Sequence, residues 1–490
     1  MANDMKDICM IIGGRSVRAR SNERFERLDP LSGEVASRAP AADVQDACDA
    51  VDAAATALPA WAAMAPSARR RLLLAGAREL TARCDEFAEC MARETGASRL
   101  WAEFNVHLAE NMLIEAASLT TQVGGEVIPS NQAGSLALAL RVPAGVVLAI
   151  APWNAPVILG VRSLAIALAC GNTVVMKGSE ICPATHELII EALNCGGLPK
   201  GVLNFVTNAP QDAEAVVEAM IGHPAVRRVN FTGSTRVGKL IAKTCAHYLK
   251  PSVLELGGKA PFLVLDDADI DAAVDAACFG AFMNSGQICM STERLVVDHR
   301  VADEFVTKLA DKASHLSKGD PRVPDDSPKV LGAVVDRATL VRCNALIVDA
   351  LAHGATLVCG GVGDSLIMPA TLLDHVTDRM RIYNEESFGP VKGIVRVADV
   401  EEAIACANDN PYGLSAAVFS SDVARAMEVA KRIESGICHI NGPTVQDEAQ
   451  MPFGGVKGSG WGRFGGKAGI DAFTELRWMT IQTTPREYPF

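Results

Sequence analysis

Three short segments carry side chains suited to covalent chemistry on a carbonyl group. Cys289 lies in "NSGQICMSTER", and a cysteine thiolate can attack a carbonyl carbon. Glu255 lies in "LELGGK", where apolar surroundings would make its carboxylate a general base. Asn154 lies in "APWNAP", and its amide can donate a hydrogen bond to a developing oxyanion. The chain has 14 cysteines, and one between Ile288 and Met290 also fits a small buried residue.

Two further segments favour a dinucleotide. "VNFTGSTRVGK" predicts a strand, a turn at Gly233 and a helix, with the Ser234 hydroxyl at a helix N-terminus that favours phosphate. Its glycines do not have the usual G-x-G-x-x-G spacing, so a capped helix after a turn is the alternative. In "VVMKGSE", Lys177 ends a predicted strand, and Glu180 follows within reach of a ribose. A carboxylate there repels a 2′-phosphate and favours NAD over NADP, unless the segment is only an exposed charged loop.

The elements that must position these residues alternate along the chain. Strands are predicted at 145–153, 173–177, 202–206 and 226–231, and helices at 155–170, 182–195, 212–221 and 235–249. A second alternating series runs from about residue 253 to about 445. Such alternation predicts two α/β domains with parallel sheets. The preceding part is expected to be helical, with Asp43 capping 44–58, Ser67 capping 68–94 and a third helix at 101–120.

Two strand-like segments lie outside both series. They are "SLALAL" (135–140) and the C-terminal "FTELRWMTIQTTPREYPF" (473–490). An unpaired strand exposes its hydrogen-bonding groups. We therefore expect these segments to add to the sheet of a neighbouring subunit in a homodimer or homotetramer. Pairing within one chain is the alternative.

Composition limits the class of protein. The chain has 490 residues, a formal net charge of −12 and a pI of about 5.3, which favours two or three domains and argues against nucleic acid as a partner. The scattered cysteines have no zinc-ligand spacing, so no metal site is expected. Unpaired thiols and the lack of an evident secretory signal favour the cytoplasm. The uncharged stretch 142–161 is long enough to span a membrane, but its three prolines argue against a membrane helix.

In this order, the motifs resemble the aldehyde dehydrogenase superfamily. The similarity rests on "PWN", "KGSE", "FTGST", "ELGGK" and "GQICMSTER", followed by "EESFGP" and "PFGGVKGSG", and it covers nearly the whole chain. It implies an α/β fold with two Rossmann-type parallel-sheet domains and a small β extension for oligomerisation. The implied division is an NAD-binding domain at 1–122 and 144–254, a catalytic domain at 255–453, and oligomerisation strands at 123–143 and 472–490.

The resemblance also implies a role for each catalytic residue. Cys289 would be the nucleophile, and Asn154 with the backbone N–H of Cys289 would form the oxyanion hole. Glu255 would activate the water that hydrolyses a thioester. Because relatives that pass the acyl group to coenzyme A lack a glutamate at this position, a free carboxylic acid is the expected product.

NAD is the cofactor that the resemblance implies. The implied cofactor-binding residues are Trp153, Lys177, Glu180, Gly233, Ser234, Glu386 and Phe388. Lys177 and Glu180 would hold the adenosine ribose, and Ser234 would contact the pyrophosphate. Glu386 would hold the nicotinamide ribose, with Phe388 beside the nicotinamide ring. A family proline is replaced here by Gly178, which is expected to loosen the ribose-binding turn.

The helix after Asn154 suggests the substrate. Ala155, Leu159 and Arg162 share one helical face. A small residue at Ala155 leaves room for a flat ring, and Arg162 would contact a polar ring substituent or instead form a salt bridge beneath the helix. Trp101 would form the opposite wall or serve only in packing. "FMNSGQICMSTER" and "MKGSEICP" are most similar to the salicylaldehyde and vanillin dehydrogenase group, which implies an aromatic, hydroxylated aldehyde.

Other functions remain open at this point. An aliphatic or semialdehyde dehydrogenase would use the same motifs. A cysteine esterase could use Cys289, Asn154 and Glu255, although no histidine lies near them to act as its base. A non-catalytic NAD-binding descendant would be expected to have lost Cys289 or Glu255, and both are present.

Overall fold

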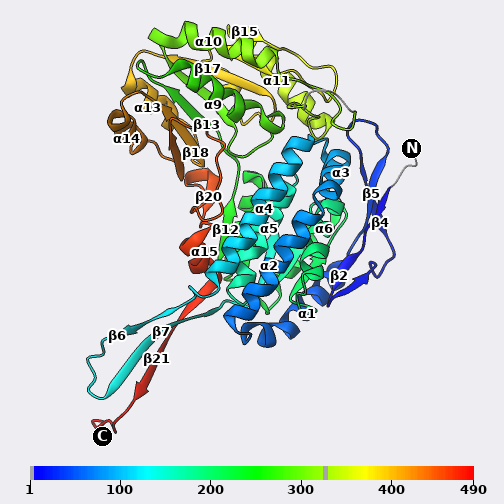
Figure 1. The fold of residues 1–490 in the computed structure, drawn as a ribbon, viewed down its shortest axis with the longest axis vertical. Coiled ribbons are helices and arrows are strands. Elements are labelled where there is room, and N and C mark those ends of the chain that lie inside the picture. Colours follow the sequence, from blue (N-terminus) through cyan, green and yellow to red (C-terminus); the bar gives the residue numbers. More distant parts are fainter. Residues whose placement is uncertain (1–4, 324–328) are drawn as a thin grey trace.

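A computed structural model describes residues 5–323 and 329–490. Two α/β bodies lie one above the other, and a β arm projects from the lower body (Figure 1). The lower body contains an eight-stranded sheet in the order β20-β12-β11-β8-β9-β10-β2-β3, whose five strands from β12 to β10 are parallel. Its strands are β2 (Met10–Ile12), β3 (Arg15–Val17), β8 (Val146–Ile150), β9 (Thr173–Lys177), β10 (Leu203–Val206), β11 (Val226–Thr232), β12 (Ser252–Glu255) and β20 (Gly460–Trp461).

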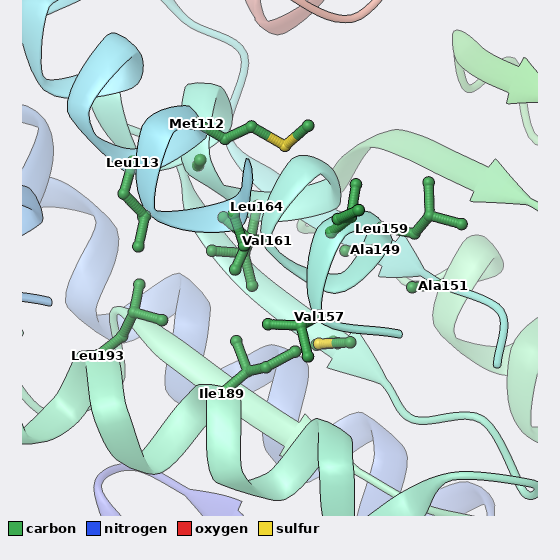
Figure 2. Close-up of a cluster of buried hydrophobic side chains, with 14 of the residues drawn as sticks. Met112, Leu113, Ala149, Ala151, Val157, Leu159, Val161, Leu164, Ile189 and Leu193 are labelled. Carbon is green, nitrogen blue, oxygen red and sulfur yellow. The ribbon is translucent and has the colours of Figure 1, made fainter. Parts of the chain in front are cut away.

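Helices pack around this sheet. They are α1 (Val44–Ala62), α2 (Pro66–Ala82), α3 (Cys84–Thr95), α4 (Arg99–Leu119), α5 (Pro156–Ala169), α6 (Pro183–Cys195), α7 (Ala213–Gly222), α8 (Thr235–His247) and α15 (Gly466–Phe473), with a short η1 (Pro210–Asp212). Figure 2 shows Met112 and Leu113 of α4 near Val161 and Leu164 of α5, with Leu193 of α6. Every residue of α5 is buried. This burial fixes the helix that follows Asn154.

The upper body contains a seven-stranded sheet in the order β15-β16-β17-β14-β13-β18-β19, parallel except for β15. Its strands are β13 (Ala260–Val264), β14 (Thr292–Asp298), β15 (Thr356–Cys359), β16 (Thr371–Asp374), β17 (Val391–Val397), β18 (Ser415–Phe419) and β19 (Ile437–Ile440). The helical elements of this part are α9 (Ile270–Phe282), η2 (Met283–Gly286), α10 (His299–Ser314), α11 (Arg337–Ala352), α12 (Arg381–Asn384), α13 (Val400–Asn408), α14 (Val423–Ala430) and η3 (Lys457–Ser459). The predicted α/β class with largely parallel sheets is confirmed.

The arm consists of β6 (Gly125–Ile128), β7 (Ser135–Pro143) and β21 (Thr474–Gln482). β21 pairs with β7 in antiparallel register from Thr474 opposite Pro143 to Gln482 opposite Ser135. The two predicted strands therefore pair within the chain, which was the alternative interpretation. Large apolar side chains stay exposed on both faces of β21, with Leu476 and Trp478 on one face and Ile481 on the other, so the arm still offers a surface to another molecule.

The N-terminal part differs from the prediction. Instead of starting with helices, it forms a three-stranded sheet of β1 (Lys6–Asp7), β5 (Val35–Pro40) and β4 (Arg24–Leu28), and β2 and β3 join the large sheet. Asp43 caps α1 as predicted. Ser67 does not cap a helix, because α2 begins at Pro66, and the helix predicted to run to residue 94 is divided at Arg83. Within the described residues, no helix is long and apolar enough to cross a membrane.

Candidate active site

The carboxyl ends of four parallel strands lie in one row along the first sheet. Lys177 of β9 pairs with Ile150 of β8, Ile150 pairs with Phe231 of β11, and Thr232 pairs with Glu255 of β12. The segments that follow these strands carry most of the predicted cofactor and catalytic residues. Ligands bind at this edge of open parallel sheets. After Glu255 the chain crosses to the second sheet, which begins at Ala260.

Cys289 lies in a tightly constrained loop between η2 and β14. Asn284, Ser285 and Gly286 have φ values of 50°, 54° and 71°, a left-handed conformation that residues other than glycine rarely adopt. A Cβ on Gly286 would lie 2.3 Å from the carbonyl oxygen of Gly389. Gly286 is therefore required by its backbone conformation and by its close contact with the backbone of Gly389.

Asn154 is connected directly to the cysteine loop. Its Nδ2 donates to the carbonyl oxygen of Gln287 at 3.0 Å, while Nδ2 of Asn284 donates to the carbonyl oxygen of Asn154 at 3.0 Å. Nε1 of Trp101 donates to the same carbonyl at 2.9 Å. A carboxamide has two donor hydrogens, so Asn154 keeps one for a reacting oxygen. Asn284 and Gln287 were missed from the sequence, since nothing in their type or spacing indicated this contact.

Glu255 is deeply buried. It is 1% exposed, and neither carboxyl oxygen has a hydrogen-bond partner in the described part of the chain. Burial raises its pKa to about 7, although Arg162 acts in the opposite direction. Burial and then the charge of Glu255 also raise the pKa of the Cys289 thiol well above its usual value. The pair is thus a protonated thiol beside a carboxyl group that changes protonation near neutral pH.

A second glutamate, Glu386 of the upper body, contacts the segment that follows Glu255. Glu386 accepts a hydrogen bond from the N–H of Gly258 at 3.0 Å, and burial raises its pKa to about 7. Phe388, two residues on, has a φ of 42°. Its ring lies edge-on to that of Trp153, with 5.8 Å between the centroids. The predicted nicotinamide-side residues are therefore brought together.

The other cofactor candidates lie along the edge of the first sheet. Lys177 forms an ion pair with Glu180, and Nδ2 of Asn208 donates to the same carboxylate at 3.0 Å. Burial would raise the pKa of Glu180, but Lys177 and Asn208 hold it below its usual value. Asn208 was not predicted. Ser234 is exposed and caps α8, accepting from the N–H of Val237 at 3.4 Å.

Two glycines at this edge are required by close packing. A Cβ on Gly233 would lie 2.6 Å from the Phe231 ring, and one on Gly178 would lie 2.7 Å from the ring of Phe205. The N–H of Gly178 also donates to the carbonyl oxygen of Val206 at 2.8 Å. The expectation that Gly178 loosens its turn was wrong, because the turn is packed against an aromatic ring and held by a backbone bond.

The predicted substrate residues are all buried. Ala155, Leu159 and Trp101 are 6%, 4% and 2% exposed. Arg162 forms a buried ion pair with Asp447, and its guanidinium carbon lies 4.0 Å from the centroid of the Phe453 ring. The predicted salt bridge is therefore present.

A cavity of about 20 Å³, lined by Arg162 among others, lies on this side of α5. Its volume is close to that needed for one water molecule. Contact between a substrate and Arg162 stays a prediction.

Comparison with known proteins agrees with this geometry. A model of the aldehyde dehydrogenase family matches residues 17–479. The chain belongs to the aldehyde dehydrogenase family. As a member of this family, it acts on aldehydes with a nicotinamide cofactor.

Several members of the aldehyde dehydrogenase family are similar over their full length. Vanillin dehydrogenase from Pseudomonas fluorescens is 59% identical, over 99% of this chain and 100% of that protein. Salicylaldehyde dehydrogenase from Pseudomonas sp. (strain C18) is 50% identical, over 98% and 99%. A crystal structure of salicylaldehyde dehydrogenase from Pseudomonas putida G7 complexed with salicylaldehyde has a TM-score of 0.97 and 49% identity, covering 99% of this chain and 100% of that one.

Proposed function

We propose that this enzyme oxidises an aromatic, hydroxylated aldehyde to its carboxylic acid with NAD, through a thioester on Cys289. The observation that carries the mechanism is the buried Glu255 carboxyl group. It has no hydrogen-bond partner in the described residues and acts electrostatically on the Cys289 thiol. A carboxyl group that titrates near neutrality beside a nucleophile is suited to proton transfer.

The first half of the reaction forms a covalent bond to sulfur. The Glu255 carboxylate takes the proton of the Cys289 thiol, and the thiolate attacks the aldehyde carbon. The carbonyl electron pair moves onto oxygen, which accepts hydrogen bonds from Asn154 and from the backbone N–H of Cys289. A donor of this kind typically stabilises the transition state by about 3 kcal/mol.

The second half releases the acid. NAD, which Glu180, Ser234 and Glu386 would hold, would supply the acceptor for the hydride that leaves the former aldehyde carbon. Cys289 is then left carrying a thioester. Glu255, having returned its first proton to solvent, removes a proton from a water molecule that attacks this thioester. The carbon–sulfur bond breaks, the acid leaves, and the sulfur of Cys289 is free again.

The residues present fit NAD. Ser234 is exposed at the N-terminus of α8, where free amides favour a pyrophosphate. Glu180 is held as a carboxylate by Lys177 and Asn208, so it can accept from two ribose hydroxyls and repels a 2′-phosphate. Glu386 has one protein donor, Gly258, in the described structure and therefore keeps acceptor capacity for the second ribose. These groups support NAD over NADP.

An aromatic substrate is supported by the relatives and by α5. Proteins named vanillin and salicylaldehyde dehydrogenase are 59% and 50% identical over essentially the whole chain. Ala155 lies directly after Asn154, and its small side chain would leave room for a flat ring. Arg162 lies on α5, and those of its N–H groups that do not bind Asp447 would meet a phenolic oxygen.

A substrate panel tests this proposal. Rates with salicylaldehyde, vanillin, benzaldehyde, succinate semialdehyde and hexanal are measured at 340 nm with NAD and with NADP. The hydroxylated aromatic aldehydes with NAD should give the highest kcat/KM, and an Arg162→Ala variant should lose their advantage over benzaldehyde. A preference for hexanal or the semialdehyde, or for NADP, would overturn the corresponding part of the proposal.

The arm supports an oligomer. We propose a homodimer or homotetramer in which the apolar face around Leu476 and Trp478 is covered by another subunit. Light scattering after gel filtration should give a multiple of 51.7 kDa, and a charged residue at Trp478 should reduce it. The domain boundaries and the cytoplasmic location predicted from the sequence stay predictions.

A further inference from the structure

A buried ionic cluster that the proposed mechanism does not use lies near the candidate active site. It consists of Lys259, Glu293, Ser387 and Lys392, each at most 2% exposed. Glu293 is at its centre. Although burial favours the neutral acid, the two lysines hold the pKa of Glu293 at about 2. Buried charges on this scale are tolerated only when they are paired and fully hydrogen-bonded.

Both oxygens of the Glu293 carboxylate are fully used. Oε1 accepts from Nζ of Lys392 at 2.7 Å and from Oγ of Ser387 at 2.5 Å. Oε2 accepts from Nζ of Lys259 at 2.8 Å and from the backbone N–H of Ser387 at 2.9 Å. Nζ of Lys259 also donates to the carbonyl oxygen of Glu385 at 2.7 Å. One carboxylate thus holds two neighbouring segments of the site.

These two segments carry or contact the nicotinamide-side residues. Ser387 stands between Glu386 and Phe388. Lys259 directly follows Gly258, whose N–H donates to Glu386. Phe388 has a φ of 42°, a strained conformation for an aromatic residue that persists only where the surroundings impose it. Ser387 directly precedes Phe388, and its two hydrogen bonds to Glu293 help to impose this backbone conformation.

The cysteine loop is held by different contacts. Nε2 of Gln287 donates to the carbonyl oxygen of Ala333 at 3.2 Å, and its Oε1 accepts from the N–H of Val335 at 2.9 Å. Oγ of Ser291 donates to the carbonyl oxygen of Gly280 at 3.0 Å. None of these bonds involves the Glu293 side chain. Loss of that carboxylate should therefore disturb the Glu386–Phe388 loop and leave the thiol in place.

We propose that Glu293 is a positioning residue for the nicotinamide end of the cofactor, acting through Ser387 and Lys259 on the loop that carries Glu386 and Phe388. This inference rests on the proposed function, in which that loop contacts the nicotinamide and its ribose. Hydride transfer depends on the distance and orientation of two bound groups, and a displacement of 1 Å can cost about a hundredfold in rate. Attack by the thiol does not require the loop to contact the cofactor.

A Glu293→Gln variant distinguishes an effect on the nicotinamide end of the site from an effect on the thiol. Aldehyde oxidation is followed at 340 nm with benzaldehyde and with benzaldehyde deuterated at the formyl carbon. Hydrolysis of p-nitrophenyl acetate without cofactor reports on the thiol, the oxyanion donor and Glu255. We expect aldehyde oxidation to fall about 10- to 100-fold, with a higher KM for NAD and a larger deuterium isotope effect than in the wild type. Ester hydrolysis should stay within about threefold of the wild type.

Three more variants separate positioning from charge and from folding. Glu293→Gln combined with Lys392→Met removes one negative and one positive charge, so it should remain as defective as the single variant. Ser387→Ala removes the hydrogen bonds of the hydroxyl group, including the one to Glu293, but keeps the backbone N–H bond to that carboxylate and removes no charge. It should show a smaller shift in the same direction even if Glu293→Gln fails to fold. Asp374→Asn removes a carboxylate that is 3% exposed and paired with Arg396 in the same sheet, and should leave the isotope effect unchanged.

The outcomes are distinct. Equal losses of oxidation and ester hydrolysis in Glu293→Gln would refute the positioning role, as would recovery in the charge-balanced double variant or an isotope effect raised equally by Asp374→Asn. Wild-type protein is run in the same assays. If it oxidises no aldehyde with NAD, the proposed function fails by itself, whatever the variants do.

Discussion

Two buried glutamates on either side of the candidate active site have opposite surroundings. Glu255 and Glu293 are 1% and 2% exposed. The oxygens of Glu255 have no partner in the described structure, and burial raises its pKa to about 7. The oxygens of Glu293 have four donors, two of them lysines, and its pKa lies at about 2.

Burial alone therefore does not decide the protonation state of a carboxyl group or its role. A buried carboxylate with every lone pair occupied is permanently charged and can hold backbone segments in place. A buried carboxyl group without partners is near the balance between its two protonation states at neutral pH, so it can accept and release a proton. The first arrangement suits positioning and the second suits catalysis.

The largest expected effect is at the partner-free glutamate. Glu255→Gln should lower steady-state aldehyde oxidation by about 10²–10⁴-fold, the usual contribution of a general base. Stopped-flow absorbance at 340 nm in the variant should show at most one NADH per subunit before turnover stalls at the thioester, and mass spectrometry should find that adduct on Cys289. Full steady-state activity would show that the two glutamates do not differ in the way described.

The next effect concerns the donor beside that carboxyl group. Asn154→Ala should lower kcat by about 10²–10³-fold, because one oxyanion donor is lost. Steady-state kinetics with benzaldehyde measures it. Since the Asn154 side chain also binds the carbonyl oxygen of Gln287, Asn154→Asp serves as a near-isosteric comparison and should be at least as inactive. A threefold loss or less would remove Asn154 from the oxyanion hole.

The two glutamates should also differ in how they affect the pH dependence of the free energy of unfolding. The folded-state pKa of Glu255 is about 7, above the ordinary value of 4.5, so its contribution is complete below pH 4.5 and is lost as pH rises through 7. The free energy of unfolding of Glu255→Gln, relative to the wild type, should therefore increase by about 3 kcal/mol between pH 5 and pH 8.5. The lowered pKa of Glu293 predicts no such gain for Glu293→Gln over this range, since its contribution is lost only as pH falls from 4.5 toward 2. Urea unfolding at both pH values tests the pair.

The smallest effect is a pH profile. Cofactor-free hydrolysis of p-nitrophenyl acetate should fall about tenfold per pH unit below pH 7, because Glu255 must be ionised to act as a base. Glu386 has a raised pKa too, and its charge raises the pKa of Glu255, so Glu386→Gln should keep an acid limb that lies at slightly lower pH. If the rate of ester hydrolysis falls only below about pH 4.5, Glu255 titrates like an exposed carboxyl group.

Much of the site could be predicted because its chemistry is local in sequence. "ELGGK", "APWNAP" and the cysteine motif each place one reactive side chain at the end of a predicted element, and the alternating pattern places strand ends at one edge. The contacts of Asn284, Gln287 and Asn208 could not be predicted, because each depends on a backbone or side-chain group from a different segment. Three of the N-terminal strands, β1, β2 and β3, were missed because two or three residues carry too little periodicity to be recognised. β4 and β5 were missed because their sequences, "RFERL" and "VASRAP", do not alternate strictly between apolar and polar residues.

By itself, the sequence determined the types of reactive groups, the alternating α/β pattern and the order in which strand ends present those groups. Only the tertiary structure decided which of two equally buried glutamates stays charged, why Gly178 and Gly286 must be glycine, and that Arg162 forms an ion pair with Asp447. The reason is physical. A residue type sets what bonds a side chain can make, but its pKa and its free bonding capacity depend on neighbours that are distant in sequence and are brought near only by packing.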